Sequence, residues 1–323
     1  MDPLTHLLDG PRARGAFTLR VVMSAPWSID VRDGSALGLG VVTSGRVWVR
    51  TRDQEAALDP GDVVLTRGPD PYVLSDRSGR PPTITVHPGQ RCVADDGQEL
   101  HVSMSHGVGM WGNDPEGAYS LVIGAYEDDS EAGRLALSAL PPLAVLRAGS
   151  VDPAVVDLLV REIITAGVAQ ASLNDRLLDC LLVMAVRAWM AEHPRTEPSW
   201  LSARGDGVVA RALELVHEGP ERPWTLASLA RACAVSRSTL AERFQRAVGT
   251  PPMAYLRTWR LTTACDLLSA RPDLGLEAVA GRVGYGSAFA FSSAFKTHTG
   301  VNPSEYRRNA HKPARPGSAA PVG

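Results

Sequence analysis

The spacing of hydrophobic residues changes along this chain and divides it into three stretches. Between about residues 15 and 125, short β-branched runs are broken by Gly, Pro and Asp; they include FTLRVVM, GLGVVTSGRVWVR, GDVVLTR and PPTITVH. Such spacing is typical of the strands of a sandwich or barrel. Between about 152 and 192, apolar residues recur every three or four positions, which predicts helices. Residues 207–308 have helical spacing throughout, interrupted by Gly and Pro turn signals.

The middle stretch, 151–195, predicts a pair of helices. VDPAVVDLLVREIITA has Pro153 suited to a first turn, and the more apolar SLNDRLLDCLLVMAVRAWMAEH follows it. Together they carry more apolar surface than a lone hairpin needs, so this surface covers the strands or pairs with a second subunit. Residues 196–206, rich in Pro, Ser and Gly, indicate a linker, and the tail 311–323 is expected to be disordered.

The last stretch contains a duplicated pattern. Residues 225–252 read TLASLARACAVSRSTLAERFQRAVGTPP, and residues 276–303 read LEAVAGRVGYGSAFAFSSAFKTHTGVNP. Matching positions are 50 or 51 residues apart: Ala230 and Ala280, Phe244 and Phe295, Gly249 and Gly300. Helix, tight turn and helix, twice over, predict two helix-turn-helix units, whose second helices can enter a DNA major groove.

A helical wheel separates a core face from an outer face in each second helix. The core positions are Leu240, Phe244 and Val248 in the first and Ala288, Phe291 and Phe295 in the second. The outward positions are Ser238, Thr239, Glu242 and Arg246, and then Phe289, Ser292, Ser293 and Lys296. An outward Phe289 either contacts a thymine methyl group or packs against the preceding helix.

Residues 253–270, MAYLRTWRLTTACDLLSA, predict one connecting helix of roughly 18 residues, about 27 Å long. Such a spacer suits two reading helices about one DNA turn, ~34 Å, apart. Basic residues in and around the two units are candidate phosphate contacts, which fix register without reading sequence. They are Arg237, Arg246, Arg257, Arg260, Lys296, Arg307 and Arg308.

Residues 207–310 resemble the DNA-binding domain of the AraC/XylS transcription regulators. The resemblance rests on LASLARACAVSRSTLAERFQRAVGTPPMAYLRTWRL and LEAVAGRVGYGSAFAFSSAFKTHTGVNPSEYRR. It implies seven helices and base-facing positions at Ser238, Thr239, Glu242, Ala288, Phe289, Ser292 and Ser293. Many relatives carry Arg where this chain has Ser293, which puts a guanine or phosphate contact there in doubt. Glu242 either accepts from a cytosine amino group or pairs with Arg246 four residues on.

Charge is segregated between the two halves. Residues 1–206 carry 18 Arg against 27 acidic residues, a net of −9, and residues 207–312 carry 14 basic against 8 acidic residues, a net of +6. Only the second half is therefore expected to meet a polyanion. Four scattered cysteines without a CxxC pair, the absence of a long apolar run, and an N-terminus unlike a secretion signal predict a cytoplasmic protein.

The first half resembles the cupin barrel. DPGDVVLTRGPDPYVL at 59–74 is similar to a cupin motif, and SGRVWVR fits the strand before it. The resemblance implies a cupin-like sensory domain over 1–150, as in one branch of the AraC family. The expected fold class is thus α+β multidomain: a cupin-like β-barrel with a C-terminal helix pair, then an all-α domain with two helix-turn-helix units.

The metal histidines of cupin enzymes are missing. Tyr72 stands where a histidine is expected after GPDP, and GLGVV lacks an HxH. Metal-dependent enzyme chemistry, the alternative function, is therefore disfavoured, and neither a metal site nor a cofactor is predicted. His87, His101 and His106 either gather around an ion or are ordinary surface residues.

Two kinds of signal remain open for the first half. Arg91 is expected to lower the pKa of Cys92 and favour its thiolate, which suits a redox role; the alternative is an unreactive cysteine. Trp27, Trp48 and Tyr72 either line a pocket for a small organic effector or only pack. Cys180, Cys233 and Cys265 lie on apolar helical faces and are expected to be buried.

The favoured function is a sequence-specific transcription regulator, with activation the commoner behaviour among the relatives. Its expected partners are promoter DNA, RNA polymerase, a second copy of the chain and a small-molecule or redox effector. A non-specific DNA-coating protein fits poorly with an acidic chain.

Overall fold

The computed structural model describes residues 17–126, 140–165, 167–193 and 205–310. The chain divides near residue 195 into two compact units, and each is described by itself. The expected disordered tail and most of the expected linker lie outside the described residues.

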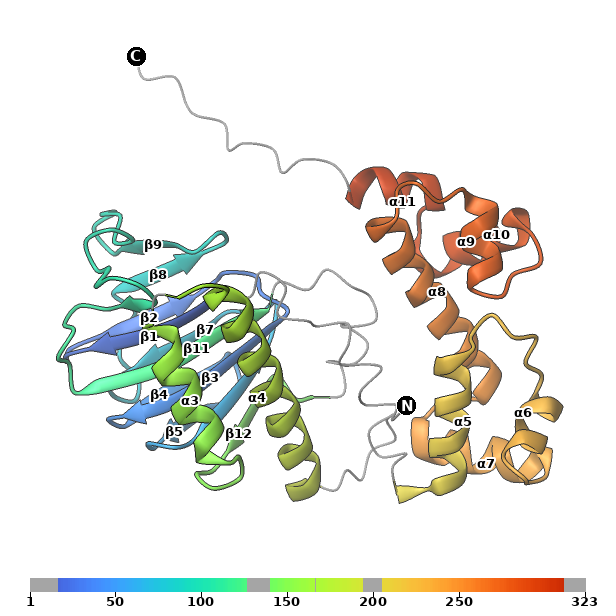
Figure 1. The fold of residues 1–323 in the computed structure, drawn as a ribbon, viewed down its shortest axis with the longest axis horizontal. Coiled ribbons are helices and arrows are strands. Elements are labelled where there is room, and N and C mark those ends of the chain that lie inside the picture. Colours follow the sequence, from blue (N-terminus) through green and yellow to red (C-terminus); the bar gives the residue numbers. More distant parts are fainter. Residues whose placement is uncertain (1–16, 127–139, 166, 194–204, 311–323) are drawn as a thin grey trace, which may run out of the picture. The chain divides into compact units, whose positions relative to one another are not determined.

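The N-terminal unit is a sandwich of two six-stranded sheets (Figure 1). The first sheet contains, in spatial order, β10 (Met110–Trp111), β1 (Phe17–Met23), β11 (Tyr119–Tyr126), β3 (Leu37–Ser44), β6 (Val63–Arg67) and β12 (Leu143–Leu146). The second contains β5 (Glu55–Leu58), β4 (Val47–Arg50), β7 (Tyr72–Ser75), β2 (Ser28–Val31), β8 (Ile84–His87) and β9 (Arg91–Ala94).

The predicted cupin-like β-fold is confirmed, and within it the two sheets form a sandwich that is not closed into a barrel. Each sheet ends in a strand with a single neighbour, and one of these end strands, β10, has only two residues. Closure needs continuous pairing around the whole ring, and none of the described end strands pairs with a strand of the other sheet. The strand character predicted for this stretch is confirmed.

The alternation of more buried and less buried side chains along a strand explains how the sheets pack on the core. In β4, Val47 and Val49 are buried whereas Trp48 and Arg50, which alternate with them, are half-buried, as one core-facing side requires. In β3, residues 37–42 are all buried, which requires that both faces of that strand be covered.

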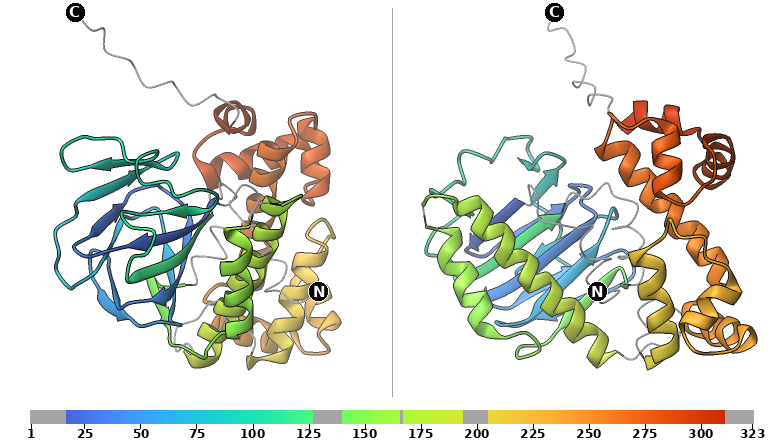
Figure 2. Two further views of the ribbon diagram at one scale, coloured as in Figure 1. Left: turned by 60° about the vertical axis from the view of Figure 1, so that its left-hand side comes forward. Right: turned by 45° about the vertical axis from the view of Figure 1, so that its right-hand side comes forward.

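Helices α3 (Pro153–Ile163) and α4 (Gln170–Glu192) lie against the first sheet (Figures 1 and 2). Asp152 caps α3 by accepting from the amide of Ala154 at 2.9 Å. A Cβ atom at Gly124 in β11 would stand 2.5 Å from a methyl group of Leu178 in α4. The absence of a side chain at Gly124 thus allows α4 to approach the sheet backbone.

The C-terminal unit has the seven helices that the resemblance implied for residues 207–310. They are α5 (Gly207–Glu218), α6 (Leu226–Ala232), α7 (Arg237–Val248), α8 (Pro252–Ala270), α9 (Leu276–Arg282), α10 (Ala288–Thr299) and α11 (Pro303–Ala310). Helices α6 and α7 form the first helix-turn-helix, and α9 and α10 form the second. The long helix α8 connects them (Figure 1).

The two units of the repeat share their turn geometry as well as their sequence pattern. The amide of Val235 donates to the Ala230 carbonyl at 3.0 Å, and the amide of Tyr285 donates to the Ala280 carbonyl at 2.8 Å. Helices α7 and α10 both end at a left-handed glycine, Gly249 or Gly300. None of the described helices is long and apolar enough to cross a membrane.

Candidate DNA-binding surface and effector cavity

The N-terminus of α7 presents a cluster of hydroxyl groups. Ser236 caps the helix by accepting from the Thr239 amide at 3.1 Å. Its hydroxyl also lies 2.9 Å from that of Ser238 and 2.8 Å from that of Thr239. Ser238 is exposed and Thr239 half-buried. These groups can donate to or accept from base edges or phosphates, and helix N-termini favour anions.

Further along α7, Glu242 and Arg246 form the intrahelical ion pair that was one of the two alternatives for Glu242. The guanidinium and carboxylate atoms are 2.5 Å apart, and both side chains are about 70% exposed (72% and 69%). An exposed pair of this kind contributes little to stability. Both charges therefore remain on the outer surface of the helix, where a DNA partner can compete for either one.

Helix α10 presents a bare aromatic ring. Phe289 is 86% exposed, so the alternative that it packs against the preceding helix is wrong. Phe291 and Phe295 are fully buried, as the helical wheel predicted. Ser293 is exposed beside Phe289, whereas Ala288 and Ser292 are half-buried. An exposed phenylalanine among small residues allows close approach of a partner surface.

The predicted phosphate contacts fall into two groups. Arg237, Arg257, Lys296 and Arg308 are exposed. Arg260 instead donates to the carbonyls of Pro220 at 2.6 Å and Arg222 at 2.7 Å, and Arg307 donates to that of Leu274 at 2.7 Å. Arg260 and Arg307 therefore hold loops against α8 and α11, a structural role that the sequence did not reveal.

Arg243 is a residue of α7 that sequence reasoning missed. Its guanidinium donates two hydrogen bonds to the Asp206 carboxylate, at 2.6 and 2.7 Å. The same carboxylate caps α5 by accepting from the amides of Val208 and Val209. A bidentate pair of this type is among the stronger hydrogen-bonded contacts. It joins α7 to the residue at which α5 begins.

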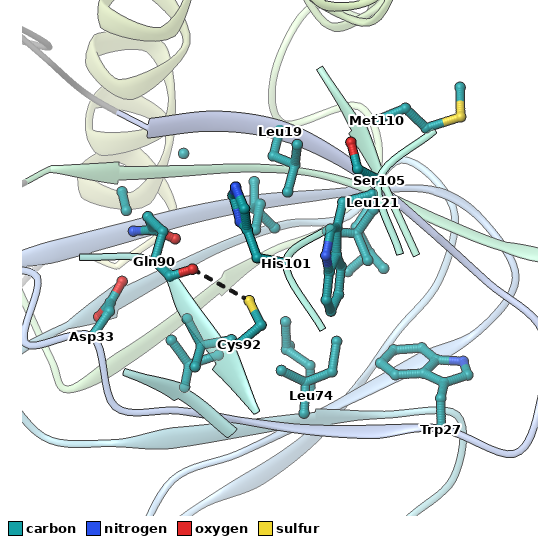
Figure 3. A pocket seen from close by; sticks show the side chains of 18 of the residues that line it. Leu19, Trp27, Asp33, Leu74, Gln90, Cys92, His101, Ser105, Met110 and Leu121 are labelled. Carbon is teal, nitrogen blue, oxygen red and sulfur yellow. Dashed lines mark hydrogen bonds between the residues drawn. The ribbon is translucent and has the colours of Figure 1, made fainter. Parts of the chain in front are cut away.

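A cavity of about 130 Å³ lies within the N-terminal unit (Figure 3). Its wall is mostly apolar and draws on both sheets and on the loop between β9 and β10; the lining includes Leu19, Val21, Leu74, Leu121, Ile123 and Gly124. Trp27, Tyr72 and Cys92 from the sequence prediction also line it. Trp48 is not among the lining residues and lies half-buried on β4.

Cys92 does not have the environment that was predicted for it. Cys92 is buried, with an exposed fraction of only 8%. The guanidinium of Arg91 forms an ion pair with Glu99 at 3.1 Å. Burial, with a contribution from the charge of Glu99, raises the pKa of the Cys92 thiol. The expected lowering by Arg91 is therefore wrong, because the guanidinium is already paired and the thiol faces an apolar cavity.

The other predictions for cysteine and histidine have mixed outcomes. Cys265 is buried as expected, but Cys180 is exposed and Cys233 half-buried, so the prediction of burial is wrong for these two. The ring of His106 lies 2.9 Å from the Gly112 carbonyl. The described residues contain no group of three His, Cys, Asp or Glu side chains that could hold a metal ion.

The fold and the two helix-turn-helix units, whose second helices have exposed outer faces, define a two-domain transcription regulator with a helix-turn-helix DNA-binding half. A model of the cupin family matches residues 2–191, and a model of the helix-turn-helix domain matches residues 229–309. The chain belongs to the AraC-like transcription regulators.

Two similar proteins match nearly the whole chain, and a third matches less than half of it. A protein of Streptomyces antibioticus described as an AraC-like transcription regulator is 30% identical over 96% of this chain and 99% of its own length. Another from Streptomyces lividans is 29% identical over 97% of this chain and 100% of its own. The HTH-type transcriptional regulator AlkR of Acinetobacter baylyi is 40% identical over 42% of this chain and 43% of its own.

Proposed function

We propose that α7 and α10 enter successive major grooves on one side of a promoter. The observation that carries this proposal is the pair of equivalent helices, each with an exposed outer face, on either side of α8. Helix α8 has 19 residues, or about 28 Å at 1.5 Å per residue, which is close to one turn of DNA. The base-facing groups are Ser238, Thr239, Glu242, Ala288, Phe289, Ser292 and Ser293.

The exposed cations supply the affinity that does not depend on sequence. Arg237, Arg257, Lys296 and Arg308 contact phosphates, and Arg246 joins them when DNA displaces its contact with Glu242. Each phosphate contact releases counterions, so the affinity falls steeply with salt concentration. Arg260 and Arg307 contribute mainly by holding the domain together.

The N-terminal unit supplies regulation through the cavity, with a small organic effector favoured over a redox signal because the Cys92 thiol has a raised pKa. Helix α4, which carries the exposed Leu173 at its N-terminal end, joins two copies of the chain. The dimer binds repeated half-sites in the cytoplasm and activates transcription by contacting RNA polymerase.

The test begins with DNA sites selected from random sequence by the full-length chain. Within each half-site, footprinting should show two protected major-groove segments one turn apart on one face. Protection of a single groove per half-site would overturn the two-helix proposal.

The same selected site tests the phosphate contacts. Arg257→Ala should lower the magnitude of the slope of log affinity against log salt by about one. Arg46→Ala, which removes an exposed arginine of the N-terminal unit, is the matched control and should leave that slope unchanged. If the two substitutions changed the slope equally, Arg257 would act only through the net charge of the chain and not through a phosphate contact.

A further inference from the structure

The cavity of the N-terminal unit has hydrogen-bond donors in its wall that find no acceptor. The indole nitrogen of Trp111 and the amide nitrogen of Gln90 are buried and have no hydrogen-bond partner, and both residues line the cavity. Trp111 is only 6% exposed. Buried N–H groups are nearly always paired, so two orphaned donors around one apolar cavity indicate a missing acceptor.

The charges around the cavity limit what that acceptor can be. No lysine or arginine is found among the described residues that line it. Its one carboxylate, Asp33, already accepts from the Ser35 amide at 3.0 Å and the Ser35 hydroxyl at 2.8 Å. Apart from the imidazole of His101 at the opening, an anionic ligand would meet no group that can carry a positive charge and would lose its hydration, so the cavity favours a neutral molecule.

The indole nitrogen of Trp27 is a third unpaired donor, but it does not face the cavity. Trp27 lines the cavity with another part of its side chain. Figure 3 shows its six-membered ring turned toward Leu74 and Cys92 and its nitrogen on the far side. Trp27 therefore contributes apolar wall, and it offers a matched control for Trp111.

We propose that this cavity binds a neutral, mainly apolar molecule of about one ring that carries a carbonyl or ether oxygen. That oxygen accepts a hydrogen bond from Trp111 or Gln90, and the hydrocarbon part packs on the aliphatic wall. The size follows from the volume of about 130 Å³, since an apolar cavity of about 150 Å³ holds benzene. His101 and Ser105, which are exposed, border the opening. This inference rests on the proposed role of the N-terminal unit in holding an effector.

Three one-ring probes separate the alternatives in titration calorimetry with the full-length chain. Acetophenone carries a carbonyl, ethylbenzene has the same shape without one, and benzoate is an anion of similar size. We expect acetophenone to bind at one site per chain about tenfold or more tightly than ethylbenzene, because only it satisfies a buried donor. Equal affinities, or tightest binding of benzoate, would overturn the proposal.

Substitutions then locate the donor. Gln90→Met removes one N–H with little change of volume, and Trp111→Phe removes one N–H together with part of the ring, a loss of volume that Trp27→Phe shares. At least one of the first two should reduce the preference for acetophenone to within about twofold while ethylbenzene binding persists. Trp27→Phe should retain the preference. A preference retained in both Trp111→Phe and Gln90→Met would contradict the assigned donors.

Failure of this inference is distinguishable from failure of the proposed function. The selected DNA site is footprinted with and without acetophenone on the same protein. Binding of none of the three probes overturns the ligand class even if the footprint shows two grooves. Selective acetophenone binding supports the ligand class, even where a single-groove footprint has overturned the DNA-reading model.

Discussion

Phe289 and Phe291 are two residues apart on α10, yet one is 86% exposed and the other is fully buried. Substitution by Ala should separate their roles. Phe291→Ala should destabilise the C-terminal unit by about 3–5 kcal/mol, because it leaves a cavity in a packed core. Phe289→Ala should leave stability within about 0.5 kcal/mol but weaken binding to the selected site by about 1–3 kcal/mol, the usual cost of one lost base contact.

Thermal unfolding and DNA-binding titration of the two purified variants provide the measurements. A Phe289→Ala protein with unchanged affinity for the selected site would remove Phe289 from the reading surface. A loss of stability in that variant would mean that the Phe289 ring packs against another part of the protein in solution.

The Cys92 thiol gives a second prediction for a single residue. Since burial and the charge of Glu99 raise its pKa, the thiolate forms only at higher pH than in a free thiol, whose pKa is about 8.5. The rate of iodoacetamide labelling at Cys92, followed by peptide mass spectrometry, should therefore reach its midpoint above that value. Glu99→Gln should move the midpoint downward; a wild-type midpoint below 8.5 would restore the redox hypothesis.

Some of these residue environments could be predicted from sequence and others could not. Helical periodicity was sufficient to assign Phe244, Phe291 and Phe295 to the core, because their burial depends on local spacing. The partners of Arg260 could not be predicted, since the Pro220 and Arg222 carbonyls are 40 and 38 positions away in the sequence. Orphaned donors such as Trp111 likewise become visible only when distant strands enclose a cavity.

At the scale of elements, the contact between Asp206 and Arg243 fixes α7 to the start of α5. Asp206 is the last residue of the predicted linker, and its carboxylate is shared between the cap of α5 and Arg243 of α7. The orientation of α7 therefore depends on a residue outside the helix-turn-helix itself. The periodicity of α7 predicted its core and outer faces, but not this lateral attachment.

Asp206→Asn tests that attachment. Burial raises the pKa of Asp206, but hydrogen bonds from Arg243 and from the amides of Val209 and Val208 outweigh it, so the pKa is lowered overall. The stabilisation is thus present above the unfolded pKa of about 3.9 and is lost as pH falls through the folded pKa. We expect the variant to be about 1–2 kcal/mol less stable at pH 7, with the difference shrinking below pH 4.

Denaturant unfolding at several pH values measures this difference. Glu242→Gln is the matched control, because it removes the exposed carboxylate of an ion pair on the same helix and should change stability by less than about 0.5 kcal/mol. A pH-independent loss in Asp206→Asn would argue against a role for the carboxylate charge.

At the scale of the whole molecule, sequence patterns predicted the order of strand-rich, helix-pair and helix-turn-helix regions. The duplication was visible because both copies need the same turn and the same buried positions. Whether the sheets form an open sandwich or a closed barrel could not be predicted, because alternation along a strand reports which face is buried and not whether the end strands pair. Pairing at the sheet edges depends on residues far apart in sequence.

Gly124 lies between the cavity and helix α4. It lines the cavity and, having no side chain, also lies against Leu178 of α4, so at that position the wall between them is a single strand of backbone. A bound molecule that displaces this strand would therefore move α4 directly, with no side chain of the strand between them at that position. We expect the position of α4 on the sheet to depend on whether the cavity is occupied.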